Sequence, residues 1–321
     1  MIPRRHISAP HRQFALYLHL KLLSGSRGKR SVQTRVPYLA AMENLRKMIN
    51  NRESIATIKD ALASSSLENL EFYVRTNEAA ESEHGISEEG LALLADAICA
   101  TGCSSSVQKE LVVYGDGVQE SGGASLAQIV RGSGISRIAC FASSRLGEGA
   151  FALADALKSP SSRVEPLDAL DLNFSLIGSA GGAALAHALD TSHAQLGRLS
   201  LRSTNLCEQV DGSPSMLAIE TFAGMLRNNT TLRTLSLGQN GIDDDGATML
   251  AEAITSNDSS SLTSLDLTGN DALGVRTRSA FDNLFRQRGE DAPPLKVVYD
   301  GNTVPKKPKM KPKRTGSKAK K

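Results

Sequence analysis

The sequence predicts an α/β fold in which about eight strand-helix units stack into a solenoid with one parallel sheet. Three observations support this fold. A nine-residue frame of aliphatic residues recurs along most of the chain, and an amphipathic helical pattern follows many of its copies. Because the hydrophobic period changes from 2 to 3.6 within these units, each unit contributes one strand and one helix. Aromatic residues make up only 4% of the chain and tryptophan is absent, so the core is aliphatic.

The strand frame is clearest in LRTLSLGQN (Leu232 to Asn240) and LTSLDLTGN (Leu262 to Asn270), which share L-x-x-L-x-L-x-x-N. Alternation of large apolar residues with others is typical of a strand with one buried face. Further copies of the frame start at Leu67, Gln108, Ile135, Leu167, Leu196 and Pro294. Successive starts lie 27 to 41 residues apart, a spacing typical of stacked repeats.

Between the strands, a second pattern predicts helices. It consists of an aliphatic residue, a few polar residues, a glycine and then apolar residues at helical spacing. The pattern occurs at Ile86–Ile98, Val118–Val130, Leu146–Leu157, Ile177–Leu189 and Ile242–Ile254. Helices that alternate with parallel strands cover the sheet on the side where both are apolar.

The joint recurrence of these strand and helix patterns resembles the leucine-rich-repeat family, and within it the ribonuclease-inhibitor-like subtype. The resemblance covers about residues 67–302. It implies a horseshoe with a concave parallel sheet and convex helices, used as a non-enzymatic scaffold for protein-protein interaction.

The ninth position of the frame changes along the chain. Reading from the end, it holds Asn302, Asn270, Asn240, Ser175, Ser143, Asp116 and Arg75. Asparagine can both donate and accept hydrogen bonds between turns, so we expect the first repeats to be less regular than the last. In the unit from Leu196, the asparagine is Asn205, one residue late, and the insertion CEQVDGSPSM (207–216) follows it.

Residues 36–66 precede the repeats and are expected to form a helical N-terminal cap, because a solenoid needs its end covered. Their apolar residues recur at helical spacing, at Leu39, Met42, Leu45, Ile49, Ile55, Ile58 and Leu62. An additional strand over residues 36–44 is the alternative, since this stretch also fits the strand frame.

The formal charge of +3 divides unevenly along the chain. Residues 1–42 carry 8 basic residues and residues 303–321 carry 9, both without an acid, whereas the body between them carries 20 basic and 34 acidic residues. Such blocks are typical of interaction or targeting segments beside a folded domain. We therefore expect a basic disordered or targeting segment at 1–35 and a disordered basic tail at 303–321.

The two basic ends suggest different destinations. The tail resembles a nuclear-import signal read by an import receptor, through Lys306, Lys307, Lys309, Lys311, Lys313 and Arg314. The same residues could tether a polyanion, or only solvate the terminus. The N-terminal segment resembles a transit peptide for a mitochondrion or plastid. A nuclear or cytoplasmic location, with an organelle as the alternative, is the resulting expectation.

Catalytic and cofactor patterns are not found in the sequence. There is no H-E-x-x-H or G-x-S-x-G, and the pair Cys99 and Cys103 lacks the partners of a zinc set. Cys140 falls on a core-facing strand position. The run Asp243 to Asp245 precedes a helix, where acids are stabilised by free backbone amides, although a cation site is the alternative. We expect no enzyme, cofactor or resident metal, and no apolar run is long enough to span a membrane.

The candidate binding site lies on the open face of the sheet. Residues that flank the core-facing leucines point to that face, and the last such position is aromatic in three consecutive units, at Tyr73, Tyr114 and Phe141. Charged positions nearby are Arg137, Arg198, Arg202 and Asp171. Aromatic residues and arginine are enriched in protein-binding hot spots. Alternatively, the rings are half-buried spacers that pack on one another.

Binding of a protein partner is the first functional expectation. The fold also resembles the Ran GTPase-activating proteins, which implies regulation of a small GTPase as an alternative, but the acidic tail of that family is replaced here by a basic one. Polyanion tethering through the tail is a third hypothesis.

Overall fold

A computed structural model describes residues 32–65, 67–75, 85–101, 109–143, 146–158, 166–190, 195–210, 213–288 and 294–300. The predicted targeting residues of the tail, Asn302 and Cys103 lie outside these ranges. Within them, no helix combines the length and hydropathy needed to cross a membrane.

All eight predicted strands are confirmed, and they form one parallel sheet in chain order. The first three strands have five residues and the other five have three. Their bounds are β1 Asn69–Tyr73, β2 Glu110–Tyr114, β3 Arg137–Phe141, β4 Ala169–Asp171, β5 Arg198–Ser200, β8 Thr234–Ser236, β9 Ser264–Asp266 and β10 Lys296–Val298. The sheet is open, with β1 at one edge and β10 at the other.

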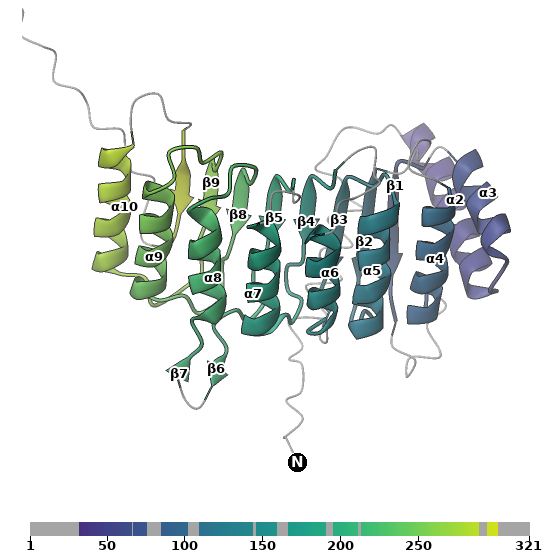
Figure 1. Cartoon of the computed structure of the whole chain (residues 1–321). Helices are drawn as coiled ribbons and strands as arrows, with labels where there is room; N and C mark the ends of the chain where they lie inside the picture. Colours follow the sequence, from purple (N-terminus) through teal and green to yellow (C-terminus); the bar gives the residue numbers. More distant parts are fainter. Residues whose placement is uncertain are drawn as a thin grey trace, which may run out of the picture.

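A helix connects each strand to the next, and Figure 1 shows these helices in one row on one face of the sheet. They are α4 Glu88–Ala100, α5 Glu120–Gly132, α6 Gly149–Lys158, α7 Gly178–Leu189, α8 Leu217–Leu226, α9 Asp244–Thr255 and α10 Val275–Gln287. Five match the helical patterns of the sequence. α8 and α10 lack those patterns, and α10 buries only Thr277, Phe281 and Leu284.

The core lies between the sheet and the helices and is mainly aliphatic. Its strand side consists of alternate strand residues such as Leu70, Leu111 and Leu199, each at most 1% exposed. Cys140 is fully buried among them, as predicted, and burial raises the pKa of its thiol to about 12. This thiol therefore acts as a small apolar residue.

Asn240 and Asn270 form a buried ladder along the strand ends. Asn240 Oδ1 accepts from the backbone N–H groups of Thr204 at 3.0 Å and Leu206 at 3.3 Å, and its Nδ2 donates to the Leu201 carbonyl at 2.6 Å. Asn270 Oδ1 accepts in turn from the backbone N–H of Asn240 at 2.9 Å. The ladder therefore satisfies backbone groups that the turns would otherwise bury without partners.

Earlier units fill the ladder position differently. Thr204, not the later Asn205, occupies it in the fifth unit, because Thr204 is buried whereas Asn205 is exposed with φ of 62°. Ser175 and Ser143 occupy it in the fourth and third units, where Ser175 Oγ accepts from the Ser143 N–H at 3.3 Å. Hydroxyl groups thus replace the amide.

The first two units have no buried side chain at this position and use the backbone instead. Val74 N–H donates to the Tyr114 carbonyl at 2.8 Å, and Gly117 N–H donates to the Val74 carbonyl at 3.2 Å. A Cβ at Gly117 would lie 2.3 Å from the Arg75 carbonyl carbon, so only glycine fits this approach. The longer strands and these bonds are the irregularity expected of the first repeats.

The N-terminal end of the sheet is covered by two helices, α2 Val32–Asn50 and α3 Ile55–Ser64. Residues 36–44 are helical, so the alternative strand is wrong, and the first helix begins four residues before the expected boundary. Ile49, Ile58 and Leu62 are buried in the same core as the repeats.

Acidic residues at the helix starts act as caps in two ways. Asp243 caps its own helix, since Asp243 Oδ1 accepts from the Gly246 N–H at 2.9 Å. The next residue, Asp244, reaches the following helix, where Asp244 Oδ1 accepts from the N–H groups of Gly274 at 2.7 Å and Thr277 at 3.0 Å. The capping prediction for this acidic run is confirmed, and the contact with a neighbouring helix adds to it.

The same arrangement occurs at the other end of the solenoid. Ser87 caps α4, and Glu88 Oε1 accepts from the N–H groups of Gln119 at 3.1 Å and Gly122 at 2.7 Å at the start of α5. Gln119 makes no side-chain cap of its own. A polar cap followed by an acid therefore serves two successive helices.

Asp244→Asn is expected to lower the free energy of unfolding at neutral pH. The variant is also expected to lose less stability than wild type when the pH is lowered. The hydrogen bond from the Thr277 hydroxyl, with the bond from the Gly274 amide, lowers the pKa of Asp244 to about 2. A depressed pKa stabilises the fold above the unfolded value of 3.8, and that contribution is lost as pH falls toward 2. Urea unfolding of wild type and variant between pH 2 and 7 measures this, with the exposed Asp245→Asn as the control. A difference that does not shrink in acid would contradict the assignment.

The insertion in the fifth unit forms a hairpin of β6 Gln209–Val210 and β7 Ser213–Pro214, which pair antiparallel. Figure 1 shows it projecting below the row of helices, near α7 and α8. At its base, Glu208 Oε1 accepts from the Ser179 N–H at 3.3 Å, so the insertion also caps α7.

Candidate protein-binding surface

The helix-free face of the sheet presents columns of outward side chains, three columns across the five-residue strands β1 to β3 and two across the three-residue strands. Because the pairing is in register, each residue of a column lies directly beside the next. Neighbouring members are about 4.8 Å apart in the direction of the hydrogen bonds. This face therefore holds a set of non-core side chains in fixed order.

The structure brings the three predicted aromatic residues together at the strand ends. Tyr73 pairs with Tyr114, and Tyr114 pairs with Phe141. The rings of Tyr73 and Tyr114 lie 5.6 Å apart between centroids at 48°, a tilted contact favourable for aromatic pairs. All three side chains are half-buried. We refer to Tyr73, Tyr114 and Phe141 as the aromatic patch.

Two glycines fix the ring of Tyr73. A Cβ at Gly85 would lie 2.8 Å from the Tyr73 ring, and a Cβ at Gly115 would lie 2.6 Å from it. Both glycines have φ near 120°, so they supply the backbone turn as well as the space. Burial, with the nearby Glu71 carboxylate, raises the pKa of Tyr114 well above its usual value. Tyr114 therefore stays neutral, and the ring of Tyr73 is held in place by the two glycines.

Arg137 and Arg198 lie at the opposite end of the strands from the aromatic patch, in the column of the first strand residues. Arg137 approaches Glu110, with 3.5 Å between Nε and Oε1. Arg198 binds Asp168 at 2.6 Å, and Arg233 binds the other oxygen of Asp168 at 2.5 Å. We call Arg137, Asp168, Arg198 and Arg233 the strand-start cluster.

Arg202 lies in the same column as the aromatic patch but is turned away from it. Its Nη1 donates to the Thr268 hydroxyl at 2.6 Å and lies 3.7 Å from Asp266. To reach them it crosses Gly238, where a Cβ would be 2.6 Å from Arg202 Nη1. Asp171 shapes a turn, because its Oδ1 accepts from the Asn173 N–H at 3.1 Å. These two predicted residues thus have structural partners on the face.

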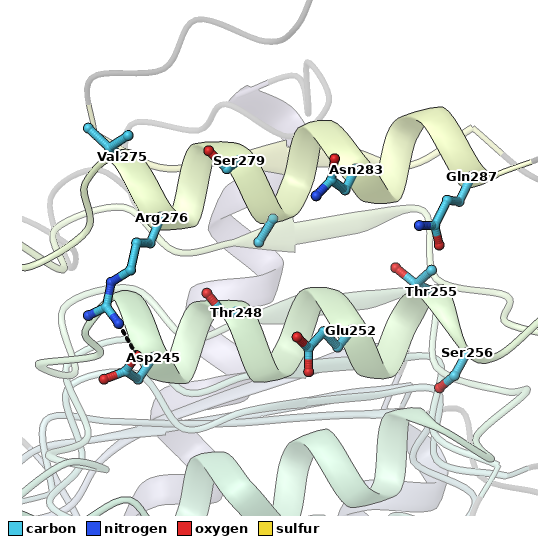
Figure 2. Close-up of a pocket in the computed structure, with 11 residues that line it drawn as sticks. Asp245, Thr248, Glu252, Thr255, Ser256, Val275, Arg276, Ser279, Asn283 and Gln287 are labelled. Carbon is cyan, nitrogen blue, oxygen red and sulfur yellow. Dashed lines mark hydrogen bonds and ion pairs between the residues drawn. The ribbon is translucent and has the colours of Figure 1, made fainter.

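On the helix side, a groove runs between α9 and α10, and Figure 2 shows hydroxyl and amide side chains along it. Asp245 and Arg276 form an ion pair of 2.5 Å at one end, and Glu252 lies further along. The hydroxyls of Thr248, Thr255 and Ser256 donate to backbone carbonyls of α9. The groove therefore has the character of a polar seam between two helices.

Other chemistry is sparse in the described part of the chain. No group of three or more His, Cys, Asp or Glu side chains there is placed to share a metal ion. The acidic run at Asp243 is occupied by helix amides, as described above.

An open parallel sheet with one free face, backed by helices in every unit, defines the class of repeat solenoids. The family model described as Leucine Rich repeat matches residues 228–251 and 258–276, which supports a leucine-rich-repeat protein. The matched residues are the units with the complete asparagine ladder. Among curated proteins, none matches the chain.

Two features of the face were not predicted from the sequence. Arg233 and Asp168 each precede a strand by one residue, so they lie outside the outward positions of the strand frame. The signal that could have identified them is Gly197, which occupies the same column between them. A Cβ there would be 2.5 Å from Arg233 Nη2 and 2.7 Å from Asp168 Oδ1.

Proposed function

We propose that this protein is a non-catalytic scaffold that holds a protein partner against the free face of its sheet. The observation that carries the proposal is the aromatic patch: three half-buried rings in neighbouring strands, with the ring of Tyr73 held between two glycines and against Tyr114. Preorganised rings lose little entropy on binding, so most of their contact energy contributes to affinity. The α-helix in every unit supports assignment to the ribonuclease-inhibitor-like subtype.

Site-specific photocrosslinking tests this proposal. A photoreactive residue at Val112, which lies on the face between Glu71 and Ala139, is expected to capture one partner from cells. The same residue at Glu252, exposed on α9, is the matched control and is expected to capture none of it. Equal capture at both positions would reject the free face as the binding surface. A captured small GTPase whose hydrolysis accelerates on addition of the protein would favour the regulator instead.

A further inference from the structure

We infer that the strand-start cluster binds a carboxylate side chain of an acidic segment in the protein partner. This inference rests on the proposed function and adds the chemistry of the ligand. It assigns the two ends of the same strands to different tasks: the aromatic patch takes apolar groups, and the strand-start cluster takes an acid.

The arrangement of the cluster leaves space for such a group. Arg137 pairs with Ala169, and Ala169 pairs with Arg198, so the two arginines flank a residue with only a methyl side chain. Two strand spacings of about 4.8 Å place their Cα atoms about 10 Å apart. A carboxylate above Ala169 therefore lies within reach of both guanidinium groups, which can bind it by paired N–H donors.

The charges and donors of the cluster also favour an anion. Arg198 and Arg233 share the single carboxylate of Asp168, so each directs one nitrogen to it and keeps most of its five N–H donors. The Nε of Arg137 is buried toward Glu110, at 3.5 Å from Oε1, which leaves the terminal nitrogens of its guanidinium group as the donors for a partner. The three arginine side chains are 37%, 48% and 58% exposed, in chain order. Their charge exceeds that of Asp168 and Glu110 together by one.

The rest of the face identifies a protein segment, and not a nucleic acid, as the source of the anion. Glu71, Asp171 and Asp266 occupy the next outward column, two residues further along their strands. Two residues correspond to about 7 Å, so these acids would repel a continuous phosphate backbone. A peptide segment with an acidic side chain and an apolar side chain fits the face better, because each strand end offers a different group. Arg137 and Phe141 are four residues apart, about 13 Å along the strand.

Selection from a displayed library of random twelve-residue peptides on the full-length protein tests the inference. Peptides enriched on wild type are expected to carry Asp or Glu with an apolar residue about four positions away. Binding of a synthesised enriched peptide is expected to fall at least tenfold in the combined variant Arg137→Gln, Arg198→Gln, Arg233→Gln. The control variant Arg131→Gln, Arg227→Gln, Arg286→Gln removes the same charge from exposed helix positions and is expected to stay within twofold.

Salt provides a readout that needs no variant: wild-type affinity for the acidic peptide is expected to fall severalfold between 0.05 and 0.5 M NaCl, as screening predicts.

Enriched peptides without an excess of acids, or equal loss in both arginine variants, would overturn the inference. Tight binding of duplex DNA through these arginines would overturn it as well. If alanine at the aromatic patch abolishes peptide binding while the arginine variant keeps it, the carboxylate site is wrong and the scaffold proposal stands. If neither the alanine variant nor the arginine variant weakens peptide binding, both the carboxylate site and the scaffold proposal are wrong.

Discussion

Combined replacement of Tyr73, Tyr114 and Phe141 by alanine is expected to weaken partner binding by at least about a hundredfold. Truncation of a single hot-spot residue costs about 2 kcal/mol or more, and a hundredfold loss corresponds to about 2.8 kcal/mol. The three residues pair in neighbouring strands, so their effects are not additive, and this expectation is accordingly a lower bound. Titration of the crosslinked partner against wild type and variant measures the loss.

A matched control is available on the helix side. Phe151, Leu217 and Val275 are exposed on three separate helices, at 46%, 50% and 81%. Their combined replacement by alanine removes comparable apolar surface and is expected to leave partner affinity unchanged. Because Tyr73 packs on Gly85 and Gly115, both variants need an unfolding curve beside the titration. An aromatic variant that folds and binds like wild type would eliminate the patch as a hot spot and leave the rings as packing spacers.

Asn240→Ala is expected to lower the free energy of unfolding by about 3 kcal/mol or more. The substitution leaves the Thr204 and Leu206 amides and the Leu201 carbonyl without the partner described above. Each buried polar group left unsatisfied costs about 1 to 3 kcal/mol, and partial relaxation or entry of water reduces the sum. Urea unfolding followed by circular dichroism is the appropriate measurement.

Asn283→Ala serves as the control for that experiment. Asn283 is exposed on α10, and its replacement is expected to change stability by less than about 0.5 kcal/mol. Equal, small effects of the two substitutions would show that water replaces the ladder at Asn240 without cost.

Much of the fold could be predicted because apolar periodicity determines burial. The eight strands and five of the helices follow from residues such as Leu232, Leu235 and Leu237, whose spacing places all of them in the core. α10 was not predicted, because a helix at the end of the row packs against a single neighbouring helix and needs few apolar residues. The fifth unit keeps the common turn, since Ser203 is left-handed like Phe174 and Gln239 at the same frame position, so Thr204 occupies the ladder position and Asn205 falls one residue beyond it.

The site was predictable in one respect and not in another. In-register parallel pairing follows from equal strand frames, so the contact of Tyr73 with Tyr114 could be anticipated. The path of Arg202 across Gly238 to Thr268 could not, because it spans two strand spacings and depends on which long side chain finds an acceptor. Aligned strand frames predict which residues are neighbours in the sheet. They do not predict which acceptor an arginine binds, because that depends on the length and rotamer of its side chain.

The capping acids and the asparagine ladder run in opposite directions along the chain. Glu88 and Asp244 satisfy the helix that follows their own, whereas Asn240 and Asn270 satisfy the turn that precedes theirs. Removal of units from either end would thus expose unsatisfied amides in the remaining part. Nearest-neighbour terms of this kind make folding cooperative across units whose packing is otherwise local. Partly unfolded forms that lack a terminal unit should accordingly be rare, and a protease that cuts between units should gain access mainly through unfolding of the whole solenoid.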